Sequence, residues 1–366
     1  MATVEQYETR TGATRYRVRY RVDKCQTSRR GFRTKKEAQQ FAATVETSMM
    51  RGEYVSPSLG RTSIGALGPG WLERQRGHIK PASHAAFDSA WRVNVAPHWG
   101  SVRIADIRRS HVQAWIADLS AQRGAETVRA AHRVLARILD DAVADHMLSS
   151  NPARGVKLPK GQPRHNTYLT AHQLDRLAQE AGEYRSMVLL LGVGGLRWGE
   201  AAALTVADID FLRRRLQLHR NAVLVRGQMV VGSLKSNKTR SVSLSAFVIE
   251  ALAATAQGKG RDELLWSTPS GGYLRPPHKP SWLSRAVARC QQADPDFPDL
   301  TAHDLRHTAA CLAISAGANP KVVQRMLGHA SAAMTLDTYA DLFDSDADQV
   351  AVTVSKIWPR ASSAAT

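Results

Sequence analysis

The chain has 366 residues, which exceeds one ordinary domain and predicts two or three compact units. Its 50 lysines and arginines against 32 aspartates and glutamates give a net charge of +18, which favours a polyanionic partner such as nucleic acid or an acidic membrane surface. The three cysteines are far apart and odd in number, which argues against a disulfide framework or a cysteine-based metal knuckle. No stretch has the apolar length of a leader or a membrane span, so we expect a cytoplasmic protein that does not bind membranes.

Residues 15–22 read RYRVRYRV, in which arginines alternate with tyrosines and valines. This period of two predicts a half-buried strand. A second strand is expected over 27–32, and Thr34 can cap a helix that runs through Glu37 to about Met50. Residues 1–55 therefore predict a small β-sheet backed by one helix. The arginine face is either solvated or a DNA-binding surface, and the charge of the whole chain favours the second. Its members are Arg15, Arg17, Arg19 and Arg21.

The segment 56–70 is rich in Gly, Pro and Ser and is interpreted as a linker. Residues 71–150 then follow a helical pattern and predict a helical second domain. The clearest helix begins near Glu126 and has one apolar face at helical spacing. That face comprises Ala131, Val134, Leu135, Ile138, Leu139 and Ala142. A separate stripe on the same helix is either solvated or a set of phosphate contacts. It comprises Arg129, Arg133 and Arg137.

Residues 151–169 are basic and interrupted by prolines, which is typical of a linker that can follow a DNA backbone. Its cations include Arg154, Lys157 and Lys160. Thr170 can then cap the first helix of a third region, 170–366. That region combines a β-pattern over 216–244 with several helical stretches. Those helices are expected over 282–290, 302–316 and 321–327. The predicted fold class is mainly α with small β-sheets, an α+β chain of several domains.

Two arginines of the third region are candidates for binding a phosphodiester. A planar guanidinium binds phosphate oxygens through two hydrogen bonds and keeps its charge at neutral pH. Arg197 follows two glycines, and Glu200, three residues later, can hold its guanidinium. Arg306 lies three residues after His303, so one helical turn can present a cation and a proton-transfer group together.

Tyr339 is the candidate nucleophile. A phenol has a pKa near 10, so attack at neutral pH requires a base or neighbouring positive charge, and His303 is the candidate base. The alkoxide that leaves must gain a proton, and Lys235, near the turn of the predicted hairpin, is the candidate acid. Lys238, in the same segment, remains an alternative. His307 is interpreted as structural.

Four segments in this order resemble the successive motifs of the tyrosine recombinase family, of the phage integrase type. They are GLRWGEAAAL, LKSNKTRSVSL, HDLRHT and LGHASAAMTLDTY. Residues 127–152 resemble the helical core-binding domain of that family, and RYRVRYRV with its helix resembles the N-terminal arm-binding domain. The resemblance therefore extends over the whole chain.

The resemblance implies a catalytic set, with Tyr339 forming a 3′-phosphotyrosyl link and freeing a 5′-hydroxyl. The matching residues are Arg197, Lys235, His303, Arg306, His329 and Tyr339. It also implies strand exchange without a cofactor, through a Holliday junction held by a homotetramer on double-stranded DNA with core-type and arm-type sites. The expected outcome is integration of phage or mobile-element DNA in a bacterial cytoplasm, and excision with a partner factor. A host DNA-bending protein is a further expected partner.

Other interpretations remain open at this level. A type IB topoisomerase-like relaxing enzyme shares the phosphotyrosine chemistry, and a catalytically silent DNA-binding regulator shares the fold. The HDLRH segment also approximates the HExxH motif of zinc proteases. Asp304 replaces the glutamate of that motif, and a guanidinium at Arg306 beside Zn²⁺ is repulsive. We therefore expect no metal site.

Overall fold

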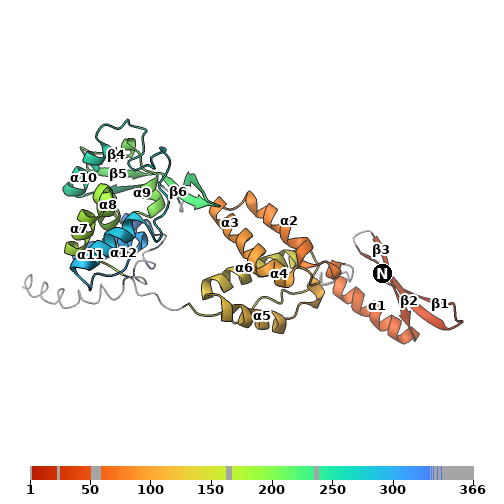
Figure 1. Ribbon diagram of the computed structural model, residues 1–366. Helices are drawn as coiled ribbons and strands as arrows, with labels where there is room; N and C mark the ends of the chain where they lie inside the picture. Colours follow the sequence, from red (N-terminus) through yellow and green to blue (C-terminus); the bar gives the residue numbers. More distant parts are fainter. Residues whose placement is uncertain are drawn as a thin grey trace, which may run out of the picture. The chain divides into compact units, whose positions relative to one another are not determined.

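The structure is a computed structural model that describes residues 2–22, 25–50, 59–161, 167–234 and 239–329, together with residues 331, 333, 336 and 339. The chain divides into two compact units, Met1–Pro163 and Arg164–Thr366. Most of the described residues are helical, and the strands form small antiparallel sheets (Figure 1). The predicted fold class is confirmed.

The first unit begins with an antiparallel sheet and continues as helices. The strands are β1 (Thr3–Glu8), β2 (Thr14–Val22) and β3 (Cys25–Phe32). The α-helices are α1 (Lys35–Met50), α2 (Ile64–Arg76), α3 (Pro81–Ala90), α4 (Ala96–Trp99), α5 (Arg109–Gln122) and α6 (Ala125–Ala144). Short 3₁₀ or π segments connect them, namely η1 (Leu59–Arg61), η2 (Trp91–Val95) and η3 (Ile104–Asp106).

The second unit alternates helices with short strands. Its helices are α7 (Ala171–Glu180), α8 (Arg185–Gly194), α9 (Trp198–Ala202), α10 (Ala246–Ala256), α11 (Trp282–Ala293), α12 (Ala302–Ser315) and α13 (Pro320–Leu327). Its strands are β4 (Ile209–Asp210), β5 (Arg215–Leu218), β6 (Arg220–Val225), β7 (Gln228–Ser233) and β8 (Arg240–Ser243). The 3₁₀ turns are η4 (Gly182–Tyr184) and η5 (Val206–Asp208).

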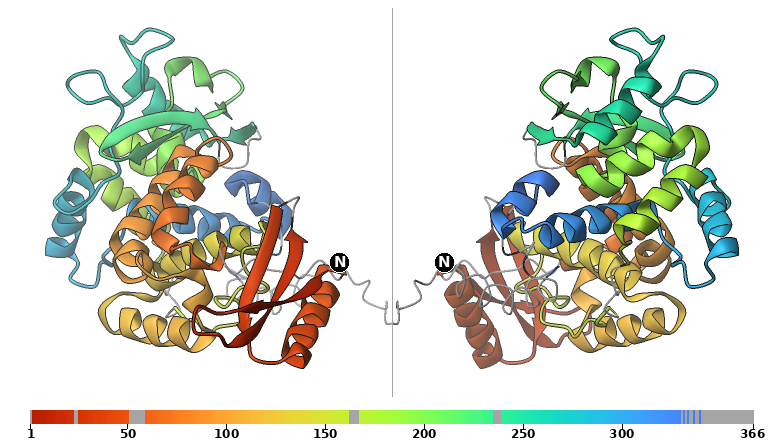
Figure 2. Two further views of the ribbon diagram at one scale, coloured as in Figure 1. Left: turned by 90° about the vertical axis from the view of Figure 1, so that its right-hand side faces the viewer. Right: turned by 90° about the vertical axis from the view of Figure 1, so that its left-hand side faces the viewer.

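The N-terminal sheet packs against α1, as the alternation of β2 predicts (Figure 2). Val18 and Tyr20 are buried against Ala38 and Ala42 of the helix, while the arginines of β2 lie on the other face. The expected cap is present, because the amide of Glu37 donates to Oγ1 of Thr34. The strand β1 was not predicted, because few of its residues are apolar and its pairing with β2 fixes it.

The helical part of the first unit has a core of its own, built around Trp71, Trp99 and Trp115. The predicted apolar face of α6 is buried at every position named from the sequence. The first half of α2 covers residues 64–70, for which the sequence predicts a linker. Close packing explains Gly68 of this helix, because a Cβ there would lie 2.1 Å from the ring of Trp91.

Side chains of α5 and α6 bind the main chain that follows α6. The side-chain amide of Gln113 of α5 exchanges two hydrogen bonds with the main chain of Lys157. Arg129 of α6 donates two hydrogen bonds to the carbonyl of Pro159, and Arg109 of α5 binds the carbonyl of Gly155. This part of the predicted linker therefore lies against the helices.

In the second unit α8 lies at the centre of the core and packs against α7, α10 and α12. The run Met187–Leu191 is buried, as its apolar character predicts. The strand β5 pairs with β4 and β8, and β6 pairs with β7 around a turn at Arg226 and Gly227, both of which have positive φ. The predicted helices of this region are present as α7, α11, α12 and α13. Thr170 caps α7 through a capping box.

Several expectations fall outside the described residues. Lys235 and Lys238 lie in the segment 235–238, which is not among the described residues, and the chain beyond Tyr339 is not described. Among the helices that the structure describes, none is long and apolar enough to cross a membrane.

Candidate active site

The site begins where α8 ends. Gly195 takes a left-handed conformation with φ of 67° and its amide donates to the carbonyl of Leu191, which closes the helix. A Cβ at this position would lie 2.6 Å from a methyl group of Leu327. Glycine therefore permits both the turn and the close approach of α13. The chain then leaves toward Arg197.

Arg197 is the residue before the first turn of α9, and Glu200 lies inside that turn. The amide of Arg197 donates to Oε2 of Glu200 at 2.8 Å, and its Nη1 donates to Oε1 at 2.9 Å. Nη2 donates over 3.4 Å to the carbonyl of Gly328, 131 residues later in the chain. The contact between Arg197 and Glu200 that the sequence predicts is thus confirmed, and it fixes one guanidinium at the start of a helix.

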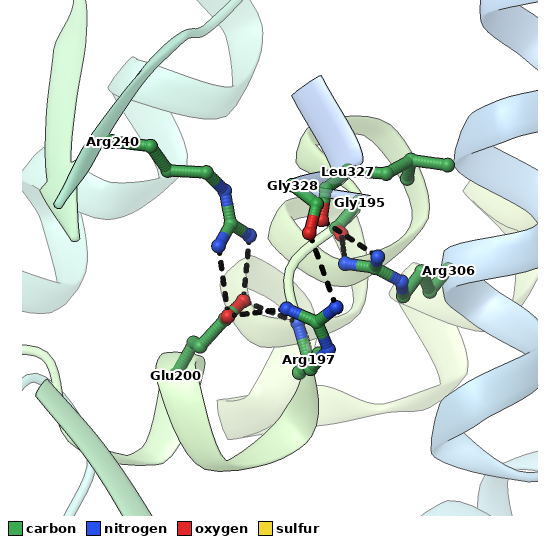
Figure 3. Close-up of polar contacts among 7 residues, drawn as sticks. All are labelled: Gly195, Arg197, Glu200, Arg240, Arg306, Leu327 and Gly328. Carbon is green, nitrogen blue, oxygen red and sulfur yellow. Dashed lines mark hydrogen bonds and ion pairs between the residues drawn. The ribbon is translucent and has the colours of Figure 1, made fainter. Parts of the chain in front are cut away.

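Glu200 is 1% exposed and also binds Arg240 of β8, which the sequence analysis did not single out. The two Nη atoms of Arg240 donate to the two carboxylate oxygens at 2.8 and 2.7 Å (Figure 3). Burial alone would raise the pKa of Glu200, but the hydrogen bonds and charge of Arg240, with those of Arg197, outweigh burial and lower it. The carboxylate is therefore charged at neutral pH and joins two arginines.

Arg306 of α12 is 3% exposed and extends toward the same place. Its Nη1 donates to the carbonyl of Gly195 and its Nη2 to the carbonyl of Leu327, each at 2.6 Å (Figure 3). Burial, followed by the charge of Arg197, lowers its pKa to about 9, so it is still protonated at pH 7. A guanidinium has five N–H donors, and these bonds use two of them.

Two histidines accompany the arginines. His303 precedes Arg306 by three residues on α12, is exposed, and meets the ring of His307 edge to face at 4.9 Å. His329 follows Gly328, whose φ of 66° ends α13. Burial and the charges of Arg306 and Arg197 lower the pKa of His329 to about 4. His329 is therefore a neutral imidazole at pH 7.

Tyr339 is 3% exposed and packs against apolar side chains of α12 and α13. Its hydroxyl is 2.8 Å from Nδ1 of His307, the residue that the sequence interpreted as structural. Burial raises the pKa of Tyr339 to about 12, against the opposing charge of Arg306. The phenol is thus protonated at neutral pH and already hydrogen-bonded to an imidazole.

The structure brings most of the predicted residues to one region of the second unit. Arg197, Arg306 and His329 surround the turn at Gly328, and Tyr339 joins α12 through His307. Lys235 and Lys238 lie outside the described residues. The residues missed from the sequence are Arg240 and the role of His307 as the partner of Tyr339. The alternation of β8 gives no signal for Arg240, whereas the spacing of His307 from His303 did place both on one helical face.

Several of the arginines expected to bind DNA elsewhere have partners within the chain. Arg17 and Arg19 of β2 form ion pairs with Glu5 of β1 at 2.6 and 3.1 Å. Arg129 binds Pro159 and Glu126, and Arg154 binds Asp140. The remaining members of both arginine sets that the sequence singled out are Arg15, Arg21, Arg133 and Arg137, of which Arg137 lies 5.1 Å from the ring of Phe87.

The spacing of HDLRH places His303 and His307 one helical turn apart on α12. Among the residues that the structure describes, no group of three or more His, Cys, Asp or Glu is arranged to hold a metal ion. Arg306, which is buried, lies on the same helix as His303 and His307. Burial, then His303, and to a smaller extent the charge of Arg306 lower the pKa of His307.

Known protein families match three successive segments of the chain. Models of three families match in order: the arm DNA-binding domain over residues 5–49, the phage integrase central domain over 65–158, and the phage integrase family over 167–346. The integrase of Mycobacterium phage D29 is 32% identical over 67% of this chain and 66% of its own length. The integrase of Mycobacterium phage FRAT1 is 31% identical over 67% of this chain and 74% of its own.

Solved structures show the same fold. The Tn1549 transposon integrase in complex with a circular intermediate DNA superposes with a TM-score of 0.69 at 19% identity, covering 78% of this chain and 99% of that one. A lambda integrase tetramer bound to a Holliday junction superposes with a TM-score of 0.57 at 17% identity, covering 89% and 95%.

Two conclusions follow. A mainly helical chain in which arginines, histidines and a tyrosine from distant segments meet has the fold and site of a tyrosine recombinase. With the matches above, the chain belongs to the phage integrase family.

Proposed function

We propose that this protein is a site-specific DNA recombinase that integrates phage or mobile-element DNA into a bacterial chromosome. The proposal is carried by the meeting of Arg197, Arg306 and His329 at the turn of Gly328. Close by, the Tyr339 hydroxyl is hydrogen-bonded to His307 of α12. These residues suit a phosphodiester, because fixed cations can stabilise the charge that develops on its oxygens.

Tyr339 is the nucleophile of this reaction. Its oxygen attacks the phosphorus, a 3′-phosphotyrosyl bond forms, and the bond to the 5′-oxygen breaks. Arg197 and Arg306 bind the non-bridging oxygens, and neutral His329 donates one hydrogen bond to them. Glu200 supports the cluster by holding the guanidinium of Arg197 in place.

The leaving 5′-oxygen takes a proton from Lys235, with Lys238 as the alternative donor. The phosphotyrosyl link keeps the energy of the cleaved bond, so a 5′-hydroxyl from a partner strand can reverse the reaction. His303, at the exposed end of the helical turn that carries Arg306, is the base that the sequence predicts for the proton of the Tyr339 hydroxyl. No cofactor takes part.

Separate parts of the chain deliver DNA to this site. Residues 1–55 bind arm-type sites, 71–150 bind core-type sites, 170–366 catalyse, and the segments 56–70 and 151–169 connect them. Separate hydrophobic clusters in the first unit support the division between the first two parts. Because α2 begins at Ile64, we expect the first connecting segment to end before that residue.

Recombination between two duplexes needs four active protomers, so we expect a homotetramer in the synaptic complex. The lambda integrase tetramer on a Holliday junction supports this expectation. A host DNA-bending protein and an excision factor are further expected partners, and the site of action is the bacterial cytoplasm.

The relatives favour this function over the alternatives. The proteins named above are integrases, whereas a relaxing enzyme of the type IB class would not depend on a partner site, and a silent regulator would not need the intact cluster. Linkage of Tyr339 to DNA would separate either enzyme from a silent regulator. Dependence of the reaction on a partner site would separate a recombinase from a relaxing enzyme.

The test is a suicide substrate, nicked next to the cleavage site so that the released strand diffuses away. The wild-type chain is expected to accumulate a covalent protein–DNA adduct, and Tyr339→Phe is expected to form none while binding the same DNA. A matched control is Tyr184→Phe, which removes a hydroxyl outside this cluster. Absence of any adduct with the wild-type chain, on DNA that it binds, would favour the regulator.

A further inference from the structure

The partner of the Tyr339 hydroxyl is His307, and this contact carries a consequence for the reaction. Nδ1 of His307 lies 2.8 Å from the phenol oxygen, and the ring planes meet at 62°. His303 contacts the ring of His307 one helical turn away. The hydrogen-bond partner of the nucleophile in this structure is therefore the second histidine of HDLRH.

A phenol that attacks phosphorus must lose its proton to a neighbouring atom. A neutral imidazole accepts a proton through whichever ring nitrogen carries none. Burial, then the neighbouring His303, lowers the pKa of His307, while Asp304 opposes this and Arg306 reinforces it. His307 is thus unprotonated at neutral pH, and with its hydrogen on Nε2 it accepts the hydrogen bond from Tyr339.

The groups that face His307 reinforce this state. From its own helix these are His303, Asp304 and Arg306, and from beyond α13 they are His329 and Tyr339. Arg306 and the neighbouring His303 disfavour a positive charge on His307 before the reaction, whereas Asp304 favours one. The same arrangement keeps the phenol within the field of Arg306, whose charge stabilises a phenolate.

We propose that His307 both positions the Tyr339 hydroxyl and accepts its proton during attack on the phosphodiester. The proposal rests on the function proposed above and moves the role of base from His303 to His307. In the step, the O–H bond of Tyr339 breaks and its proton passes to Nδ1 of His307. The phenol oxygen bonds to phosphorus, the bond to the 5′-oxygen breaks, and that oxygen takes a proton from the lysine. Religation returns the proton from His307 to the phenol.

The experiment measures the rate of adduct formation on the suicide substrate from pH 6 to 10, with the full chain. His307→Ala removes the acceptor, and His307→Asn keeps a polar atom near the position of Nδ1 that can hold the phenol but not take its proton. Removal of a general base typically lowers a rate by about 100-fold or more. Ser315→Ala, an exposed position on the same helix, is the matched control. DNA binding by gel shift and thermal melting confirm that each variant is folded.

We expect both His307 variants to be slowed by about 100-fold at pH 7, with His307→Asn the faster of the two. Their defect should shrink as pH rises, because hydroxide replaces the missing base, and a purely structural role would not do this. A substrate with a 5′-bridging sulfur, whose leaving group needs no proton, should leave the defect unchanged. His303→Asn should be less impaired than His307→Asn.

Three results would overturn the proposal while leaving the proposed function intact. The first is adduct formation at the wild-type rate in His307→Ala and His307→Asn. The second is faster adduct formation in these variants, which would make the contact a restraint on the nucleophile. The third is full rescue by the 5′-sulfur, which would place His307 at the leaving group. Failure of the wild-type chain to form any adduct would instead refute the proposed function.

Discussion

Glu200 offsets part of the positive charge of the site. It is 1% exposed and shares its two oxygens between Arg197 and Arg240, while Arg306 lies nearby without a carboxylate among the contacts described above. One negative charge among three guanidiniums leaves the cluster with an excess of positive charge. That excess suits a phosphodiester. Burial, and after it this excess of positive charge, lowers the pKa values of Arg306 and His329.

Arg240 is expected to be a positioning residue for Arg197. Arg240→Gln removes one partner of a buried ion pair and leaves the carboxylate behind, so we expect the free energy of unfolding to fall by about 3 kcal/mol, measured by urea denaturation. Adduct formation should slow as well, because Glu200 can then draw Arg197 away from the phosphate. The double variant Arg240→Gln/Glu200→Gln should lose less than the sum of the two single variants.

A surface pair supplies the control for this prediction. Arg213 and Asp210 are 3.8 Å apart, with side chains 82% and 38% exposed. Arg213→Gln should change the free energy of unfolding by less than about 1 kcal/mol. An equal loss in Arg213→Gln and Arg240→Gln would show that the buried contact contributes nothing beyond a surface ion pair.

At the scale of elements, periodic patterns predicted most of what the structure contains. The helix α6 follows from its apolar face, and α12 follows from the segment that carries HDLRH. The strand β1 was missed because an edge strand needs few apolar residues and is held by its partner. The first half of α2, residues 64–70, was assigned to a linker because its glycines and proline resemble loop composition. The close packing of Gly68 depends on Trp91, which is distant in sequence.

Two glycines of α2 test this explanation. A Cβ at Gly68 would lie 2.1 Å from Trp91, whereas the nearest atom to a Cβ at Gly70 is the mobile end of Arg74 at 3.6 Å. Gly70→Ala should raise the midpoint of thermal unfolding slightly, because alanine favours a helix by up to about 1 kcal/mol. Gly68→Ala should lower it, because Trp91 must move in a packed core. A stabilising Gly68→Ala would contradict the packing explanation.

At the scale of the whole molecule, the net charge of +18 is the property that bears on DNA affinity. Affinity should fall steeply with salt, because each neutralised phosphate releases counterions. The structure distinguishes two arginines of α6 in this respect. Arg129 is bound to the main chain of Pro159, whereas Arg133 is exposed.

Arg133→Gln is expected to reduce the slope of log K against log salt concentration by about one, and Arg129→Gln to leave that slope unchanged. Arg129→Gln should instead free the segment after α6, which limited digestion with trypsin would detect as faster cleavage after Lys157 and Lys160. Equal changes in slope for both variants would mean that Arg129 leaves Pro159 to bind a phosphate.

The sequence by itself determined the fold class, most helices, and the identity of the residues that meet at Gly328, because local periodicity and short motifs are properties of neighbouring residues. It also determined that Glu200 holds Arg197, a contact within one helical turn. Only the tertiary structure decided that Arg240 shares Glu200 and that His307 rather than His303 contacts Tyr339. Those contacts join segments 32 to 40 residues apart, and their geometry depends on how α12, α9 and β8 pack rather than on any local pattern.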